Sequence, residues 1–324
     1  MKKMYSSTCK PTQCVICNGM AHPNICLYDD RYGYPGLFQM VECCDCGHRM
    51  LDVDFSAKEI TTLYSEYYPR STFALKNFRP ARGAHGFNAW LSGIKRCAYL
   101  WVPENVRVLD IGCGFGESLA YHKARGCDVY GVEADENILR VAETFGFNAH
   151  AGVFDPDRYA PDFFDYITLD QVIEHMAFPV ETLCGIARVL KPGGKVILST
   201  PNASGWGAKL FGRRWINWHA PYHLQHFSFQ SMQIAAEKAG LKMERIRTLT
   251  SSEWLSYQWI HLLIFPNMGE PSPFWSPNGK RNARTRLITI LLAQVNRTRI
   301  NHVLTRMFDA VGFGDGMLIF LKKV

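Results

Sequence analysis

A glycine-rich turn that follows an apolar strand constrains the fold of this chain more than any other feature of its sequence. Residues 108–111 are apolar except for Asp110, and every second residue of the next five is glycine. The three glycines are Gly112, Gly114 and Gly116. Glycine permits a tight turn and lets the backbone approach a ligand closely. A helix is expected from Glu117, and its first N–H groups would attract an anionic group of that ligand.

Two carboxylates narrow the choice of ligand. Glu133 ends the second expected strand, about 20 residues after the turn, where it can accept hydrogen bonds from both ribose hydroxyls. Asp110 would repel a pyrophosphate, but it suits a ligand that carries an ammonium and a sulfonium group. S-adenosylmethionine carries both groups. The two residues therefore favour this cofactor over a dinucleotide.

The chain alternates between strand-like and helix-like sequence from Val106 onward. The expected strands are rich in Val, Ile and Leu, are bounded by Gly, Pro or Asp, and cover residues 106–111, 128–133, 166–169 and 195–199. Helical stretches fall between them. This alternation predicts an α/β fold with a parallel sheet that is covered by helices on both faces.

Three blocks of this sequence resemble class I S-adenosylmethionine-dependent methyltransferases, in particular the small-molecule type 11/12/23-like group. Residues 108–116 resemble motif I, residues 164–176 the fourth strand and its loop, and residues 190–202 the fifth strand and the turn before it. The resemblance covers roughly residues 100–250. It implies a Rossmann-like sheet of seven strands with an antiparallel last strand, which residues 314–320 would supply.

The same resemblance places the cofactor contacts at the ends of the first four strands, where an open α/β sheet binds its ligands. Residues of the first strand and its turn would hold the methionine portion, and Glu133 would hold the ribose. Two residues after the third strand would contact the adenine, and two at the tip of the fourth strand would line the cofactor. The expected contacts are Asp110, Gly112, Gly114, Gly116, Glu133, Phe154, Asp155, Asp170 and Gln171.

The cysteines predict a metal site near the N-terminus. Seven of the eleven lie in the first 46 residues, and four of them form two Cys-x-x-Cys pairs. The predicted ligands are Cys14, Cys17, Cys43 and Cys46. Four thiolates can close a tetrahedral zinc site without an open position, so the expected role is structural. Further candidate ligands are Cys9, Cys26, Cys44 and His48.

We therefore expect a zinc-ribbon-like module over residues 1–54, a helical linker over 55–104 and a methyltransferase domain over 105–324. A helical insertion is expected at about 252–310. In the linker, Ser56 and Glu59 predict a capping box at the start of a helix. The N-terminal layout resembles a bacterial subgroup of small-molecule methyltransferases, many of which are linked to sugar, polysaccharide or secondary-metabolite pathways.

Histidines are the candidate catalytic residues, because transfer to a hydroxyl requires removal of a proton. His175 follows the fourth strand and is either a general base or a brace for its loop. The segment 215–228 holds three histidines, His219, His223 and His226. Two of them would brace the loop, and His223 is the second catalytic candidate. Its aromatic residues suit either stacking on an acceptor or core packing. A metal-assisted mechanism through these histidines stays open.

The insertion has two interpretations. Its apolar residues at helical spacing suit a lid over the active site, or a surface that rests on an anionic membrane and reaches a lipid-linked acceptor. Residues 277–308 hold seven Lys and Arg and no acid, which accounts for the net charge of +7. No apolar run approaches a membrane span and no signal-peptide core follows the first residues, so a cytoplasmic protein is expected, with peripheral membrane contact through residues 254–308 as an option.

The sequence thus predicts S-adenosylmethionine-dependent methylation of a small molecule, most simply at a hydroxyl of a sugar, a glycan precursor or a secondary metabolite. One alternative is an RNA base methyltransferase with an N-terminal zinc module. The basic segment lies far from the cysteines, which argues against nucleic acid as the main partner. The other alternative is a non-catalytic binding protein, but the glycine turn and its acids are intact.

Overall fold

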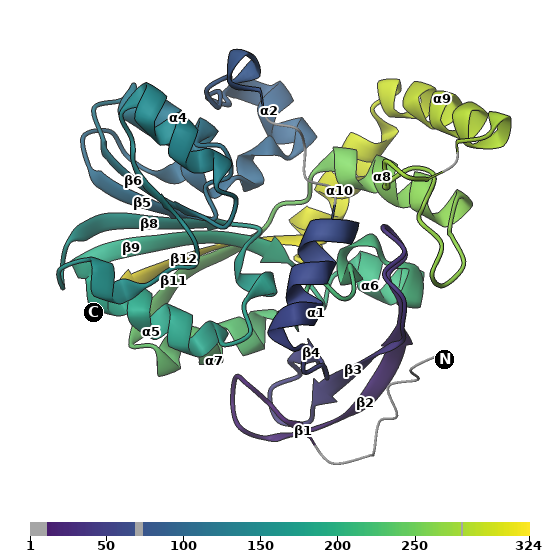
Figure 1. Cartoon of the computed structure of the whole chain (residues 1–324), viewed down its shortest axis with the longest axis horizontal. Helices are drawn as coiled ribbons and strands as arrows, with labels where there is room; N and C mark the ends of the chain where they lie inside the picture. Colours follow the sequence, from purple (N-terminus) through teal and green to yellow (C-terminus); the bar gives the residue numbers. More distant parts are fainter. Residues whose placement is uncertain (1–11, 69–73, 280) are drawn as a thin grey trace.

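The computed structural model describes residues 12–68, 74–279 and 281–324, and within these ranges the strands form two sheets (Figure 1). The larger sheet has seven strands in the order β11-β12-β9-β8-β5-β6-β7. Its strands are β5 (Arg107–Ile111), β6 (Asp128–Glu133), β7 (Asn148–Ala151), β8 (Phe164–Asp170), β9 (Leu190–Pro201), β11 (Leu241–Thr248) and β12 (Gly316–Lys323). Strand β12 is antiparallel to both of its neighbours, whereas β5 to β9 run parallel.

The predicted Rossmann-like sheet with an antiparallel last strand is therefore confirmed. The last strand begins at Gly316, two residues later than expected. The fifth expected strand is longer than predicted, because β9 runs through the whole Lys-Pro-Gly-Gly segment.

Helices cover both faces of this sheet. They are α3 (Glu117–Lys123), α4 (Asn137–Phe145), α5 (Pro179–Val189) and α7 (Phe229–Lys238). Figure 1 shows α4 on one face and α5 and α7 on the other. Successive residues of β5 point to opposite faces: Val108 joins a core with Ile138 of α4, whereas Leu109 joins a core with Leu183 of α5. Burial on both faces explains why these strands are apolar throughout.

The smaller sheet joins the N-terminal module to the rest of the chain. Its order is β1-β2-β3-β4-β10, with β1 (Thr12–Gln13), β2 (Met20–Leu27), β3 (Phe38–Cys43), β4 (Arg49–Leu51) and β10 (Gln225–His226). Strand β10 comes from the loop before α7 and pairs with β4, with Gln225 opposite Met50. The buried side chain of Ile16 also belongs to the same core cluster as Met232 of α7. The module is thus packed directly onto the large sheet's helices.

Short helices fill the linker. Helix α1 (Ala57–Thr62) begins with the predicted capping box of Ser56 and Glu59, and a π-helix (Leu63–Tyr67) continues it. The other short helices of the linker are η2 (Leu75–Asn77), α2 (Gly86–Ser92), η3 (Ile94–Arg96) and η4 (Ala98–Trp101). The short helices outside the linker are η5 (Pro156–Arg158), η6 (Ile173–His175), η7 (Gly212–Arg214) and η8 (Ile216–Trp218).

The expected insertion is helical. After α6 (Trp206–Phe211), which precedes it in the chain, the insertion holds α8 (Ser252–Leu263), α9 (Ala283–Arg297) and α10 (Ile300–Ala310). These three helices lie between β11 and β12 in the sequence, and Figure 1 shows α9 away from the large sheet. Among the described residues, no helix is long and apolar enough to span a membrane.

Candidate active site and metal centre

The glycine turn after β5 has the backbone that its sequence requires. Gly112, Gly114 and Gly116 all have positive φ angles, which favour glycine. A Cβ on Gly112 would lie 2.4 Å from Cγ2 of Val172, whereas a Cβ on Gly114 would meet nothing closer than Oε2 of Glu117 at 3.8 Å. Gly112 therefore serves close packing, and Gly114 borders open space.

Two carboxylates lie beside this turn. Glu133 ends β6, and its Oε2 accepts a hydrogen bond from the backbone N–H of Gly114 at 2.9 Å. Asp110 is buried: its Oδ1 accepts from Oγ1 of Thr168 at 2.7 Å, and its Oδ2 accepts from the hydroxyl of Ser118. Burial raises the pKa of Asp110 to about 6. Sequence reasoning found both acids but missed the two hydroxyl partners, which are identifiable only once the strand and the helix are packed together.

The end of β8 places a third carboxylate at the same edge of the sheet. Oδ2 of Asp170 accepts from the backbone N–H of Ala98 at 3.0 Å, and Oδ1 accepts from the hydroxyl of Ser199. Burial raises the pKa of Asp170. The next residue, Gln171, has a φ of 59°, a left-handed conformation that is uncommon outside glycine and often marks functional sites.

The two residues expected at the adenine follow β7. The ring of Phe154 is partly buried and stacks on Tyr159 with centroids 6.5 Å apart. The carboxylate of Asp155 accepts from the backbone N–H of Asp157 at 3.0 Å and so caps η5. Their neighbour Val153, which sequence reasoning did not single out, is 82% exposed although it is apolar. Adenine contact by this segment stays a prediction.

The two candidate catalytic histidines lie together. The ring centroids of His175 and His223 are 4.7 Å apart. Nδ1 of His175 lies 2.9 Å from the carbonyl oxygen of Tyr222, and Nδ1 of His223 lies 2.9 Å from that of Asn217. A carbonyl oxygen can only accept, so each Nδ1 carries the hydrogen and each Nε2 keeps a lone pair. Burial lowers the pKa of His175 to about 4 and that of His223 also falls, so both rings are neutral.

An aromatic wall adjoins these histidines. It consists of Tyr32 from the N-terminal module, Tyr64 and Tyr68 from the linker, and His219 and Tyr222 from the loop before β10. The ring centroids of Tyr68 and Tyr222 are 5.1 Å apart. Three separate parts of the chain build this wall, so sequence spacing alone could not reveal it.

The other aromatic residues of the same loop serve the core. Trp215 and Trp218 are almost completely buried, with ring centroids 4.7 Å apart at nearly a right angle. The alternative of acceptor stacking by these two indoles is therefore wrong, because core packing leaves no ring face open.

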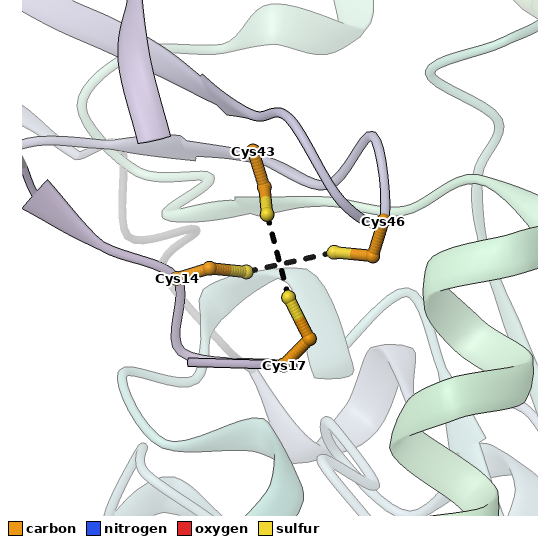
Figure 2. A group of neighbouring side chains, drawn as sticks. All are labelled: Cys14, Cys17, Cys43 and Cys46. Atoms are coloured by element: carbon orange, nitrogen blue, oxygen red, sulfur yellow. Dashed lines mark hydrogen bonds between the residues drawn. The ribbon is translucent and has the colours of Figure 1, made fainter. Parts of the chain in front are cut away.

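The four predicted cysteine ligands converge between β1 and β4 (Figure 2). The Sγ atoms of Cys14 and Cys46 are 3.6 Å apart, and those of Cys17 and Cys43 are 3.3 Å apart. A zinc ion with Zn–S bonds of about 2.3 Å requires sulfur atoms about 3.8 Å apart, close to this arrangement. Burial raises the pKa of Cys14 to about 11, so zinc would have to displace a proton there.

The further candidate ligands do not join this cluster. Cys26 and Cys44 are exposed, and Nε2 of His48 lies 2.9 Å from Oε1 of Gln225. Cys9 lies outside the described residues. Among the described residues, the group of neighbouring ligand atoms consists of the four predicted cysteines, and Cys26, Cys44 and His48 do not belong to it.

A comparison with known protein families covers the glycine turn and the strands around it. A family model described as a methyltransferase domain matches residues 81–246, about half of the chain. The chain belongs to this methyltransferase family. The expected class of S-adenosylmethionine-dependent methyltransferases is thereby confirmed.

Relatives of this methyltransferase include O-methyltransferases. A ubiquinone biosynthesis O-methyltransferase from Aromatoleum aromaticum is 35% identical over 117 residues, which cover 32% of this chain and 49% of that protein. The protein of the same name from Xanthomonas axonopodis pv. citri is 28% identical over 166 residues, or 47% of this chain and 69% of that protein. The chain thus spans about half of the first relative's length. A solved S-adenosylmethionine-dependent methyltransferase from Archaeoglobus fulgidus has a TM-score of 0.42 at 20% identity, covering 69% of this chain and 88% of that one.

In this methyltransferase, α8 of the insertion lies against the active-site edge of the sheet. A cavity of about 30 Å³ is bordered by Gln171 at the end of β8, Asn217 of the histidine loop, and Trp254 and Gln258 of α8. Oε1 of Gln258 also accepts from the backbone N–H of Ile216 at 2.8 Å. Helix α8 therefore borders the candidate site, and its role as a lid stays a prediction.

Proposed function

We propose that this methyltransferase transfers a methyl group from S-adenosylmethionine to a hydroxyl group of a small molecule. One observation carries the proposal: two neutral histidines, His175 and His223, each hold a loop through Nδ1 and keep an Nε2 lone pair beside the end of β8. Such a lone pair can act on an acceptor hydroxyl in two ways: it can accept the proton directly, or it can bind a cation that holds the hydroxyl. The cofactor supplies an electrophilic methyl carbon on a sulfonium, and the protein contributes positioning.

The residues at the sheet edge fit S-adenosylmethionine. Asp110, Glu133 and Asp170 bring three carboxylates to the region where a sulfonium and an ammonium would lie, which favours these cations. The free space at Gly114 leaves room for the ligand against the backbone. In this proposal Glu133 holds the ribose, and Asp170 and Gln171 lie beside the methionine portion.

Tyr222 is almost completely buried, so the partly buried rings of Tyr32, Tyr64 and Tyr68 are the part of the aromatic wall that could stack on a flat or sugar-like face of an acceptor. A sugar or a glycan precursor remains our proposed acceptor, and the names of the relatives add intermediates of ubiquinone biosynthesis. Both classes present a hydroxyl. The wall includes Tyr32, so the N-terminal module would contribute to acceptor binding.

The test begins with calorimetric titration of the purified protein with S-adenosylmethionine and S-adenosylhomocysteine. Micromolar binding is the expected result. Hydroxylated sugars, lipid-linked glycans, phenolic quinone precursors and RNA would then be incubated with labelled cofactor. Label on a small-molecule hydroxyl supports the proposal, label on RNA favours the RNA alternative, and absence of cofactor binding by the folded chain would favour the non-catalytic alternative.

We also propose that Cys14, Cys17, Cys43 and Cys46 hold a structural zinc ion. The convergence of the four Sγ atoms supports this, since the donor atoms all lie within 4.8 Å of one another. Four thiolates leave no coordination position for a substrate, so the ion would stabilise the module and take no part in catalysis.

A peripheral membrane contact is the proposed role of an outer surface that the insertion forms together with α2 of the linker. Large apolar side chains at helical spacing are at least 40% exposed on three helices. They are Phe87 and Trp90 on α2, Leu287, Ile290, Leu291 and Val295 on α9, and Ile300, Val303 and Met307 on α10. Helix α10 packs against both α2 and α9. We call these residues the outer apolar surface. Exposed apolar surface together with nearby arginines suits an anionic bilayer.

One of the seven cations counted in the sequence is not part of that surface. Arg306 is buried, and its Nη2 lies 2.6 Å from Oδ2 of Asp309. Its Nη1 donates to the carbonyl oxygen of Trp90 at 2.7 Å. The expectation that Arg306 contributes to a cationic surface is therefore wrong, because its charge is neutralised within the fold.

A further inference from the structure

Three potential ligand atoms meet behind the end of β8, apart from the cysteine cluster. Glu174 and His175 belong to η6, and His223 belongs to the loop before β10. One donor atom from each of these residues lies within 4.8 Å of the other two. Two imidazoles and one carboxylate form a ligand set that binds divalent transition metals and leaves further coordination positions open.

Both rings make the second hydrogen bond that is typical of ligand histidines. Each donates its Nδ1 hydrogen to a backbone carbonyl oxygen, of Tyr222 or of Asn217, at 2.9 Å. Metal-bound histidines almost always make such a bond, because it fixes the tautomer and directs the Nε2 lone pair to the ion. Because Nδ1 of each ring is engaged by the backbone, Nε2 is the atom that each ring can offer to an ion.

Glu174 supplies an independent observation. Its side chain is completely buried, and its Oε2 accepts from Oγ1 of Thr200 at 3.0 Å. Its Oε1 is also buried and has no hydrogen-bond partner among the described residues. A buried carboxylate oxygen without a partner costs stability. A cation bound between Glu174 and the two histidines would remove that cost.

We propose that Glu174, His175 and His223 bind one divalent transition-metal ion, which holds the hydroxyl of the acceptor. This step rests on the proposed O-methylation. A hydroxyl bound to a divalent cation loses its proton more readily, as water does. The acceptor oxygen forms a bond to the methyl carbon, the carbon–sulfur bond breaks and its electron pair stays on sulfur. The hydroxyl proton passes to solvent.

His219 lies beside the proposed ligands but is not assigned the proton, because burial lowers its pKa well below its ordinary value. Its ring centroid lies 4.9 Å from that of His223, and its buried Nε2 has no hydrogen-bond partner among the described residues. In this arrangement His175 and His223 bind the cation, so neither acts as the free base that the sequence suggested.

The test is a titration of the full-length, zinc-loaded protein with Mn²⁺, followed by electron paramagnetic resonance. Mn²⁺ is the probe because thiolates prefer zinc, so the cysteine cluster should not take it up. We expect one Mn²⁺ per chain. Glu174→Gln, which keeps the shape of the side chain, and His223→Gln should each weaken Mn²⁺ binding at least tenfold.

His226→Gln is the matched control, since His226 is buried near the same loop but is absent from the ligand group. Unchanged Mn²⁺ binding in this variant supports ligation by the proposed residues. Circular dichroism of all three variants shows whether each is folded. If Glu174→Gln is not folded, the loss of Mn²⁺ binding is judged from His223→Gln. Equal binding by wild type and ligand variants, or no binding by the wild type, would overturn the proposal.

The outcome also separates this site from the proposed reaction. Specific Mn²⁺ binding without methylation of any hydroxyl leaves the metal site standing and removes O-methylation. Hydroxyl methylation that is unchanged in Glu174→Gln and in chelator-treated protein leaves O-methylation standing and removes the metal site.

Discussion

Two glycines of the turn after β5 differ in what a side chain there would meet. A Cβ on Gly112 would clash with Val172 at 2.4 Å, so a larger residue would disturb packing and binding together. The Cβ of an alanine at position 114 would have 3.8 Å to its nearest neighbour, Oε2 of Glu117. Gly114 is therefore the position at which cofactor binding can be separated from folding.

Gly114→Ala is expected to weaken S-adenosylmethionine binding at least tenfold, because the new methyl group occupies the space left for the ligand. The left-handed backbone should cost about 1–2 kcal/mol of stability. Calorimetric titration and chemical denaturation measure the two effects. Gly240→Ala is the control: Gly240 also has positive φ, and a Cβ there meets nothing within 4 Å. Equal cofactor affinity in the two variants would contradict the placement of the site.

At the scale of single residues, the sequence identifies side chains that belong to a motif. It does not identify the residues that form hydrogen bonds or ion pairs with them. Glu133 was predictable because it ends a strand at a set distance from the turn, and the structure brings it to Gly114. Thr168 and Ala98, which bind Asp110 and Asp170, come from elsewhere in the chain. Arg306 looked like a surface cation because its partner Asp309 lies just outside the basic run.

The cysteine module offers a test at the scale of one element. The Cys43→Ser variant should no longer bind zinc, and its melting temperature should be lower. The reason is that the ion would no longer link the two Cys-x-x-Cys pairs of the module. Zinc content and thermal denaturation measure this. Cys44→Ser is a matched control, because Cys44 is adjacent but exposed and outside the cluster. Retention of zinc by Cys43→Ser would show that the assigned ligand set is wrong.

The outer apolar surface offers a second test at this scale. Leu291→Asp on α9 should weaken binding to vesicles that contain anionic phospholipid several-fold, because it places a negative charge where the bilayer would lie. Vesicle co-sedimentation measures the effect. Leu139→Asp on α4 is the control, since Leu139 is similarly exposed on another part of the molecule. The membrane proposal fails if the wild type stays in solution at low salt.

Strands with a clear apolar sequence pattern were predictable. Short strands that exist only because they pair with a neighbouring strand were not. The four expected strands and the last strand all appear in the large sheet. Strand β10 has only two residues and exists because β4 lies beside it. Neither Gln225 nor His226 has a sequence pattern typical of a strand. The pairing of this segment with the N-terminal module therefore depends on tertiary contacts alone.

Buried histidines should make the stability of the whole molecule depend on pH. Burial lowers the pKa of His122 and His175 to about 4 and that of His226 to about 3. Below pH 6.5 these histidines bind more protons in the unfolded chain than in the folded one, so their contribution to the free energy of unfolding falls as the pH is lowered toward 4. Buried carboxyls whose pKa is raised, such as Asp110 to about 6 and Asp315 to about 7, contribute the opposite slope in this window. Each such histidine contributes a slope of about 1.4 kcal/mol per pH unit within that window.

His122→Leu should flatten this slope by about the contribution of one proton, because both ring nitrogens of His122 are buried without a hydrogen-bond partner among the described residues. Denaturant titrations at several pH values between 4 and 7 measure the slope. His85→Leu should leave it unchanged, since His85 is exposed. A slope that is the same in the wild type and in His122→Leu would show that His122 is protonated in the folded protein.

The pairing of β4 with β10 also affects how the protein is made. During synthesis β4 leaves the ribosome long before β10, whose Gln225 pairs with Met50. At roughly 5–20 residues per second, the gap of roughly 170 residues lasts on the order of 10–30 seconds. Throughout that time the nascent module carries an open strand edge, which can pair with another chain. Slower translation or truncation before residue 225 should therefore favour aggregation over folding.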